Sequence, residues 1–190
     1  MKSLTLALAT VATTATVSPA HAAMGAFPSF ATGFAHPVGG IDHILVMVTV
    51  GVWGVVAGGR ALWVWPAVFV ATMLAGFAAA TLGWQVPWVP AAVSASIIVL
   101  GLMVALAVRA PVWLGAALVG LFAFFHGHAH GTEVGVASFV AYGAGFALAT
   151  AALHLGGIGL ALAGEGSIGK RALQAIGALT VLGGLALIGT

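Results

Sequence analysis

The chain contains no cysteine and very little charge. Its 190 residues include only five Lys or Arg and three Asp or Glu, so charged side chains make up 4% of the sequence. Without Cys, neither a disulfide nor a thiolate metal site can form, and any metal ion must bind nitrogen, oxygen or thioether sulfur. The basic residues are too few to form a patch, which argues against a nucleic-acid partner.

Hydrophobic residues dominate what is present. They make up 62% of the chain, and the mean hydropathy is +1.21. So few polar side chains cannot cover the surface of a soluble globule. We therefore expect an all-α, polytopic protein of the lipid bilayer, because helices satisfy their own backbone hydrogen bonds inside a membrane.

The first 22 residues are typical of a secretory signal peptide. A moderately apolar run from Leu4 to Val17 is followed by the small-residue sequence Ala-His-Ala at 20–22. The run is short for a membrane span and is diluted by Thr, which favours cleavage over retention as a first helix. We expect a signal peptide at 1–22 and a single transmembrane domain at 23–190, with the mature amino terminus outside the cytoplasm.

Glycine and proline divide the remaining sequence into apolar segments joined by short connections. Each segment is long enough to span a bilayer as a helix. The expected architecture is a compact bundle of six transmembrane helices without a soluble domain. The segments lie at about 36–58, 61–83, 88–108, 111–131, 134–161 and 172–189.

The basic residues predict the orientation of this bundle. With the mature amino terminus outside, Arg60, Arg109, Lys170 and Arg171 all fall in connections on the cytoplasmic side. This distribution satisfies the positive-inside rule and favours a multi-pass protein of the bacterial inner membrane. Aromatic belts are then expected on the outer side at Trp84 and Trp88, and on the inner side at Trp63, Trp65 and Trp113.

Two histidine clusters contain every acidic residue except Glu165. They are HPVGGIDH at 36–43 and HGHAHGTE at 126–133. In the expected topology both lie near the outer face, with His43 and His126 on the order of 10 Å below the ends of their segments. Polar groups are costly inside a membrane and usually mark a functional site. The two clusters therefore predict one shared metal site at the outer face.

Helical spacing suggests how the first cluster is arranged. Pro37 suits the first position of a helix, which places His36 at the helix boundary. His36, His43 and Met47 then follow the i, i+7, i+11 positions of one helix face. Asp42 is either a direct metal ligand or the acceptor that orients the His43 ring.

The second cluster follows the same logic. His126, His130 and Glu133 lie at i, i+4 and i+7 on one face, and a His pair at i, i+4 can chelate one ion. His128 departs from this face, so it either captures ions at the outer mouth or is simply solvated. His154 is expected near the inner face, where it either assists release together with Glu165 or is a solvated interfacial residue.

The sequences HPVGGIDHILVMVTVGVW at 36–53 and FHGHAHGTE at 125–133 together resemble the HupE/UreJ family of hydrogenase and urease accessory membrane proteins. The resemblance covers the whole mature chain. The first motif also resembles the His-x4-Asp-His signature of nickel/cobalt transporters, but five residues separate His36 from Asp42 here.

The HupE/UreJ resemblance implies a permease, not an enzyme, that imports nickel or cobalt for metalloenzyme assembly. Zinc is also compatible with imidazole and carboxylate ligands. The expected partners are the divalent cation, the lipid bilayer, and either a second copy of the chain or a cytoplasmic metallochaperone. The metal-binding residues carried over by the resemblance are His36, Asp42, His43, His126, His130 and Glu133.

Two alternatives from other functional classes fit the same residues. Three His and an Asp holding zinc near one membrane face could activate water, as in an intramembrane zinc-dependent hydrolase with Glu133 as general base. His43 paired with His126 could instead serve as the axial ligands of a b-type haem. Nothing in the sequence suggests a soluble or lateral substrate domain, which favours transport over hydrolysis.

Overall fold

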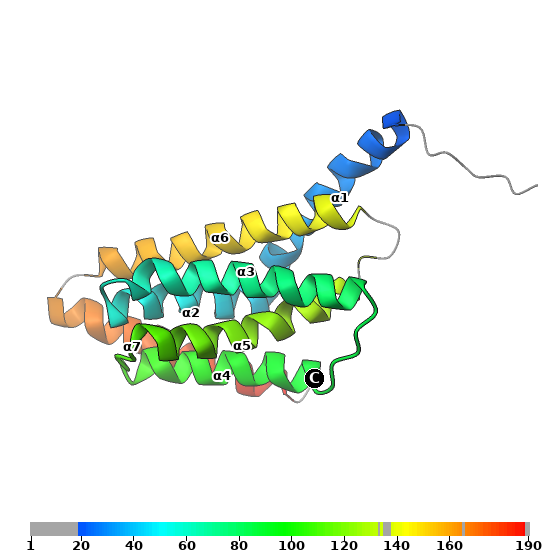
Figure 1. Ribbon diagram of the computed structural model, residues 1–190. Coiled ribbons are helices and arrows are strands. Elements are labelled where there is room, and N and C mark those ends of the chain that lie inside the picture. Colours follow the sequence, from blue (N-terminus) through cyan, green and yellow to red (C-terminus); the bar gives the residue numbers. More distant parts are fainter. Residues whose placement is uncertain (1–18, 133, 135–137, 165, 189–190) are drawn as a thin grey trace, which may run out of the picture.

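The computed structural model describes residues 19–132, 134, 138–164 and 166–188. This part of the chain forms helices joined by short connections, and it contains no strand. All but one of the helices run roughly side by side (Figure 1). The helices are α1 (Pro19–Gly39), α2 (Ile41–Ala57), α3 (Ala61–Thr81), α4 (Val89–Ala105), α5 (Val112–Gly131), α6 (Phe139–Ala163) and α7 (Gly166–Leu187).

The expected all-α architecture is confirmed, but the first segment was placed incorrectly. It was expected to be one helix beginning near His36, with Pro37 at its first position. Both residues instead lie in the last turn of α1, and α2 begins after a break at Gly40. Residues 29–39 and α2 meet at an angle of 78°. Signal-peptide cleavage stays a prediction: residues 1–18 lie outside the described part, and α1 runs through the expected cleavage point.

Long apolar helices identify a multi-pass membrane protein. By length and composition, α3, α5 and α6 can each cross a membrane. The bent pair of residues 29–39 and α2 passes the same test when it is counted as one span. Helix α4 is apolar but has only 17 residues. These features do not establish the expected number of six spans.

Reciprocal glycines allow the helices to pack closely. In each of four helix pairs, one glycine from each helix faces the backbone of the other helix. A Cβ atom at Gly157 of α6, for example, would overlap the Val48 carbonyl of α2. Backbone approach through small residues is the usual way in which membrane helices gain packing energy. The pairs are Gly33 with Gly145, Gly51 with Gly157, Gly76 with Gly127, and Gly101 with Gly177.

The basic residues gather at one end of the bundle. Figure 1 shows the α2–α3, α4–α5 and α6–α7 connections at the same end. Arg60 and Arg109 lie in two of these connections, and Lys170 and Arg171 lie in the first turns of α7. Arg109 and Lys170 border the same pocket, which confirms that these two are neighbours. We call this the basic end.

The expected aromatic belts are partly wrong. Trp63, Trp84, Trp88 and Trp113 are exposed on the bundle surface, as the belts require. Trp65 is instead fully buried, with its ring centroid 4.1 Å from that of Trp53. Its indole N–H donates to the Val112 carbonyl at 2.9 Å. A buried Trp with a satisfied N–H is a core residue that joins α3 to α5.

Two adjacent glycines of α6 test the packing account. Gly157→Ala should lower the thermal unfolding midpoint in detergent, because its new methyl group overlaps the Val48 carbonyl and overpacking costs about 1–3 kcal/mol. Gly156 has no heavy atom within 4 Å of its Cβ position. Gly156→Ala should therefore keep or raise the midpoint, because Ala is favoured over Gly in a helix by about 1 kcal/mol. Equal midpoints for the two variants would contradict the account.

Candidate metal centre

The break between α1 and α2 leaves room for a pair of polar side chains. Gly40 has an extended conformation (φ −99°, ψ 121°), and its carbonyl accepts the first hydrogen bond of α2 from Ile44. A Cβ atom at Gly40 would lie 2.6 Å from His43 Nδ1 and 2.8 Å from Asp42 Oδ1. Glycine suits this position because the Asp42–His43 pair occupies the space that a side chain would take. The Asp42 carboxylate also lies in the first turn of α2, where the helix dipole favours negative charge.

Asp42 fixes the orientation and the tautomer of His43. The Nδ1–H of His43 donates to Asp42 Oδ1 at 2.8 Å, while the His43 side chain is 3% exposed and that of Asp42 is 31% exposed. The lone pair on His43 Nε2 therefore points into the bundle. This is the arrangement in which a carboxylate supports a metal-binding imidazole. Of the two roles left open for Asp42, this geometry favours orientation of His43 over direct ligation.

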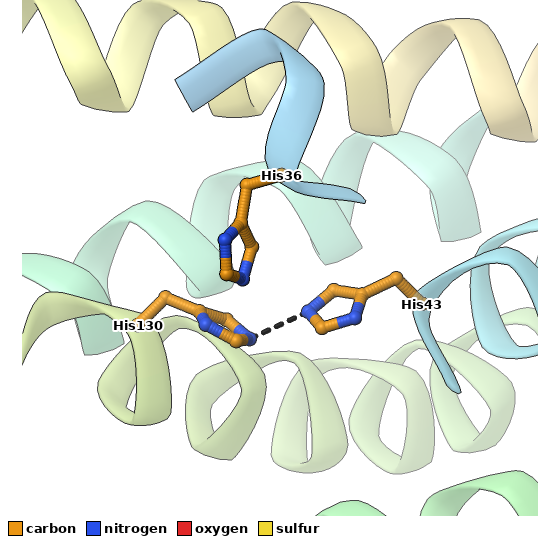
Figure 2. A group of neighbouring side chains, drawn as sticks. All are labelled: His36, His43 and His130. Atoms are coloured by element: carbon orange, nitrogen blue, oxygen red, sulfur yellow. Dashed lines mark hydrogen bonds between the residues drawn. The ribbon is translucent and has the colours of Figure 1, made fainter. Parts of the chain in front are cut away.

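Three imidazoles from three helices meet at the bend (Figure 2). His43 Nε2 lies 2.5 Å from His130 Nε2 of α5. His36 of α1 lies over both rings, with its centroid 4.4 Å from that of His130 and 5.3 Å from that of His43. One ligand atom from each ring falls within 4.8 Å of the others. We call His36, His43 and His130 the outer histidine cluster.

A pocket of about 540 Å³ adjoins the outer histidine cluster. Its lining includes the three histidines, Asp42 and Gly39. His36 is partly exposed, whereas His43 and His130 are 2% and 7% exposed. A cation can therefore enter from the His36 side and reach ring nitrogens that are shielded from water.

Two aromatic rings of α6 pack against the outer histidine cluster. The Phe146 ring centroid lies 5.3 Å from that of His130 and 6.3 Å from that of His43. Tyr142, one turn earlier on α6, lies 6.3 Å from His36. These contacts hold the imidazoles in an apolar setting, where electrostatic interactions are stronger than in water. Neither residue was predicted from the sequence, although their spacing of four residues on a helix that follows the second motif was a usable signal.

The other two predicted ligands are His126, which lies next to the outer histidine cluster, and Glu133. His126 is fully buried one turn before His130, with its ring 5.8 Å from that of His43. Its Nδ1–H donates to the Phe122 carbonyl at 3.1 Å. Glu133 lies outside the described residues. The structure thus brings the two motifs together, although more than 80 residues separate them in the sequence.

The two histidines with open roles are both buried. His128 is 5% exposed, and its Nε2–H donates to the Trp84 carbonyl at 2.8 Å, which ties α5 to the α3–α4 connection. His154 was expected near the inner face, but it lies in the middle of α6 and is 1% exposed. The solvated interpretation is therefore wrong for both residues. His154 lies deeper than its sequence position suggested, because α6 spans Phe139–Ala163 and so begins and ends later than the expected segment 134–161.

The outer histidine cluster has the chemistry of a divalent cation site. Neutral imidazole nitrogens are ligands for Ni, Co and Zn. The proton of neutral His43 is on Nδ1 and is directed at Asp42, so His43 Nε2 carries a lone pair. His130 Nε2–H donates to that lone pair. A cation bound by these two nitrogens would replace that shared proton, with His130 changing tautomer. Three imidazole nitrogens would leave further coordination positions for water.

Comparisons with known proteins cover nearly the whole chain. The family model described as "HupE / UreJ protein" matches residues 6–187. "Protein HupE" of Rhizobium leguminosarum bv. viciae is 40% identical over 181 residues, which span 94% of this chain and 95% of that protein. No solved structure matches the chain.

Metal binding by the purified protein tests this geometry. Equilibrium dialysis should show that Asp42→Asn weakens nickel binding by about 10- to 100-fold, the usual effect of removing a carboxylate that supports a ligand. His43→Ala should weaken it at least as much. His128→Gln is the matched control, because the amide keeps a donor for the Trp84 carbonyl and lies outside the cluster. If His128→Gln weakened binding as much as His43→Ala, the assignment of the site would be wrong.

Proposed function

Because this chain belongs to the HupE/UreJ family, we propose that it is a membrane permease that imports divalent nickel or cobalt for hydrogenase or urease maturation. The cation is captured at one end of the bundle by His36, His43 and His130, with Asp42 orienting His43. We expect the other predicted ligands of the second motif, His126 and Glu133, to take part in handling the cation as well. The zinc-hydrolase alternative is not favoured by membership of this family.

The meeting of both motifs at one pocket carries this proposal. The histidines come from α1, α2 and α5, so any one motif alone supplies an incomplete ligand set. The pocket beside them opens next to a bent helix pair, and the first motif forms that bend. Binding sites of membrane transporters commonly lie at such breaks, where irregular backbone lines a cavity.

The distribution of charge supports an inward direction of transport. The outer histidine cluster lies toward the end that holds the α3–α4 connection and the last turn of α5, opposite the basic end (Figure 1). Basic connections face the cytoplasm in membrane proteins. With the basic end in the cytoplasm of a bacterial inner membrane, the cluster faces the periplasm and the mature amino terminus lies on that side.

Uptake into proteoliposomes tests the transport function. Wild-type protein should accumulate nickel or cobalt ions faster than empty vesicles, in a comparison that also includes Zn, Mn and Cu. His43→Ala and Asp42→Asn should lower the initial rate by about tenfold or more, since the first loses a ligand of the ion and the second loses the carboxylate that orients this ligand. Normal insertion with wild-type uptake in both variants would show that the cluster is not the transport site.

The absence of cysteine allows a direct test of orientation. Gln85→Cys places a thiol in the exposed α3–α4 connection, and Ala110→Cys places one in the α4–α5 connection at the basic end. A membrane-impermeant maleimide added to intact spheroplasts should label Gln85→Cys and leave Ala110→Cys unlabelled until the membrane is opened. Labelling of Ala110→Cys alone in intact spheroplasts would reverse the proposed direction.

A further inference from the structure

His154 is a buried polar residue that the entry site does not use. It is 1% exposed, and neither ring nitrogen has a hydrogen-bond partner within the described part of the chain. A buried polar group without a partner costs free energy, and in a membrane protein it usually marks a function. Among the described residues, His126 Nε2 is the other buried histidine nitrogen without a hydrogen-bond partner.

These two histidines contact the same aromatic ring. The Phe69 ring centroid of α3 is 5.9 Å from that of His126 and 4.9 Å from that of His154. The ring of His126 is in turn 5.8 Å from that of His43 in the outer histidine cluster. The imidazoles thus form a sequence of short steps that leads from the entry site into the middle of the bundle.

Successive turns of α6 lie along this series of rings. Phe146 contacts the outer histidine cluster, and Thr150, one turn later, donates to Met73 Sδ at 3.6 Å. His154 follows after another turn, so it lies roughly 12 Å along the helix axis from Phe146. From there α6 continues toward the basic end. His154 therefore lies beyond the entry site on the side to which an imported ion must travel.

We propose that His126 Nε2 and the His154 ring bind the transported divalent cation in succession, as an inner station whose two rings both contact Phe69. This inference rests on the proposed transport function and extends it to a residue outside both sequence motifs. The ion leaves the outer histidine cluster for His126 and then moves past the Phe69 ring. His154 then receives it before release toward the basic end.

The chemistry of the inner station suits brief occupancy. His126 directs Nδ1–H to the Phe122 carbonyl, so its Nε2 carries a lone pair and is ready to bind a metal. His154 offers one lone pair as a neutral ring, and neutral imidazole binds Ni, Co and Zn. Because the ion binds these rings in succession, each supplies one nitrogen and holds a divalent cation more weakly than the three nitrogens of the outer histidine cluster. Weak successive sites allow an ion to move on.

A substitution that keeps the volume but removes the nitrogens tests this proposal. His154→Leu should insert and melt like wild type or at a higher temperature, because it eliminates two unpartnered buried groups. Its equilibrium binding of nickel at the outer cluster should be unchanged, while its initial rate of nickel uptake into proteoliposomes should fall by about tenfold or more. Leu155→Ala, at the neighbouring exposed position of α6, is the control and should transport like wild type.

The possible results separate the inner station from the entry site. His43→Ala should lose both binding and uptake, whereas His154→Leu should lose uptake alone. Wild-type uptake by His154→Leu would overturn the inner station and leave the proposed permease intact. No uptake by the wild-type protein would instead contradict the permease itself. If neither His154→Leu nor His154→Phe inserted in the membrane, His154 would be a folding residue and the proposal would be wrong.

Discussion

The site depends on the break in the chain at Gly40. A continuous helix would carry His36 and His43 on one axis, separated by almost two turns. The 78° bend instead turns one ring above the other and directs both toward His130. The same glycine leaves the space in which Asp42 accepts the Nδ1–H of His43. One residue without a side chain therefore determines both the position of the imidazoles and the direction of their lone pairs.

The rest of the bundle keeps this site rigid while remaining almost entirely apolar. Reciprocal glycines bring α1 and α2 against α6, and α3 against α5, so the helices around the imidazoles approach one another backbone to backbone. Such packing holds the helices together where the hydrophobic effect between them is weak. Within this apolar interior, ring contacts run from His43 to His126 and through Phe69 to His154. In the proposed permease these buried histidines line the route of the imported ion.

The sequence predicted the features that depend on composition and on regular patterns. Hydropathy identified a helical membrane protein, the two motifs identified the HupE/UreJ family, and the basic residues placed both motifs at the same end. The details that depend on the path of the backbone were not predictable. Pro37 was interpreted as the start of a helix, but it lies in the last turn of one, and the sequence alone does not separate these two cases. The burial of His154 and Trp65 depends on helices that are distant in the sequence. Helical spacing also assumed an unbroken first segment, so it brought His36 and His43 together for the wrong reason.

X-ray absorption spectroscopy of the nickel-loaded protein tests the central claim most directly, because it reports the ligands of the bound ion. If His36, His43 and His130 hold one cation, the spectrum should show the multiple scattering of imidazole rings from a single nickel environment with additional light-atom ligands. His130→Ala, which removes the contribution of α5, should visibly reduce that imidazole signal, and His128→Gln should leave it unchanged. A bound nickel without imidazole scattering, or a spectrum unaffected by His130→Ala, would contradict a site built from both motifs.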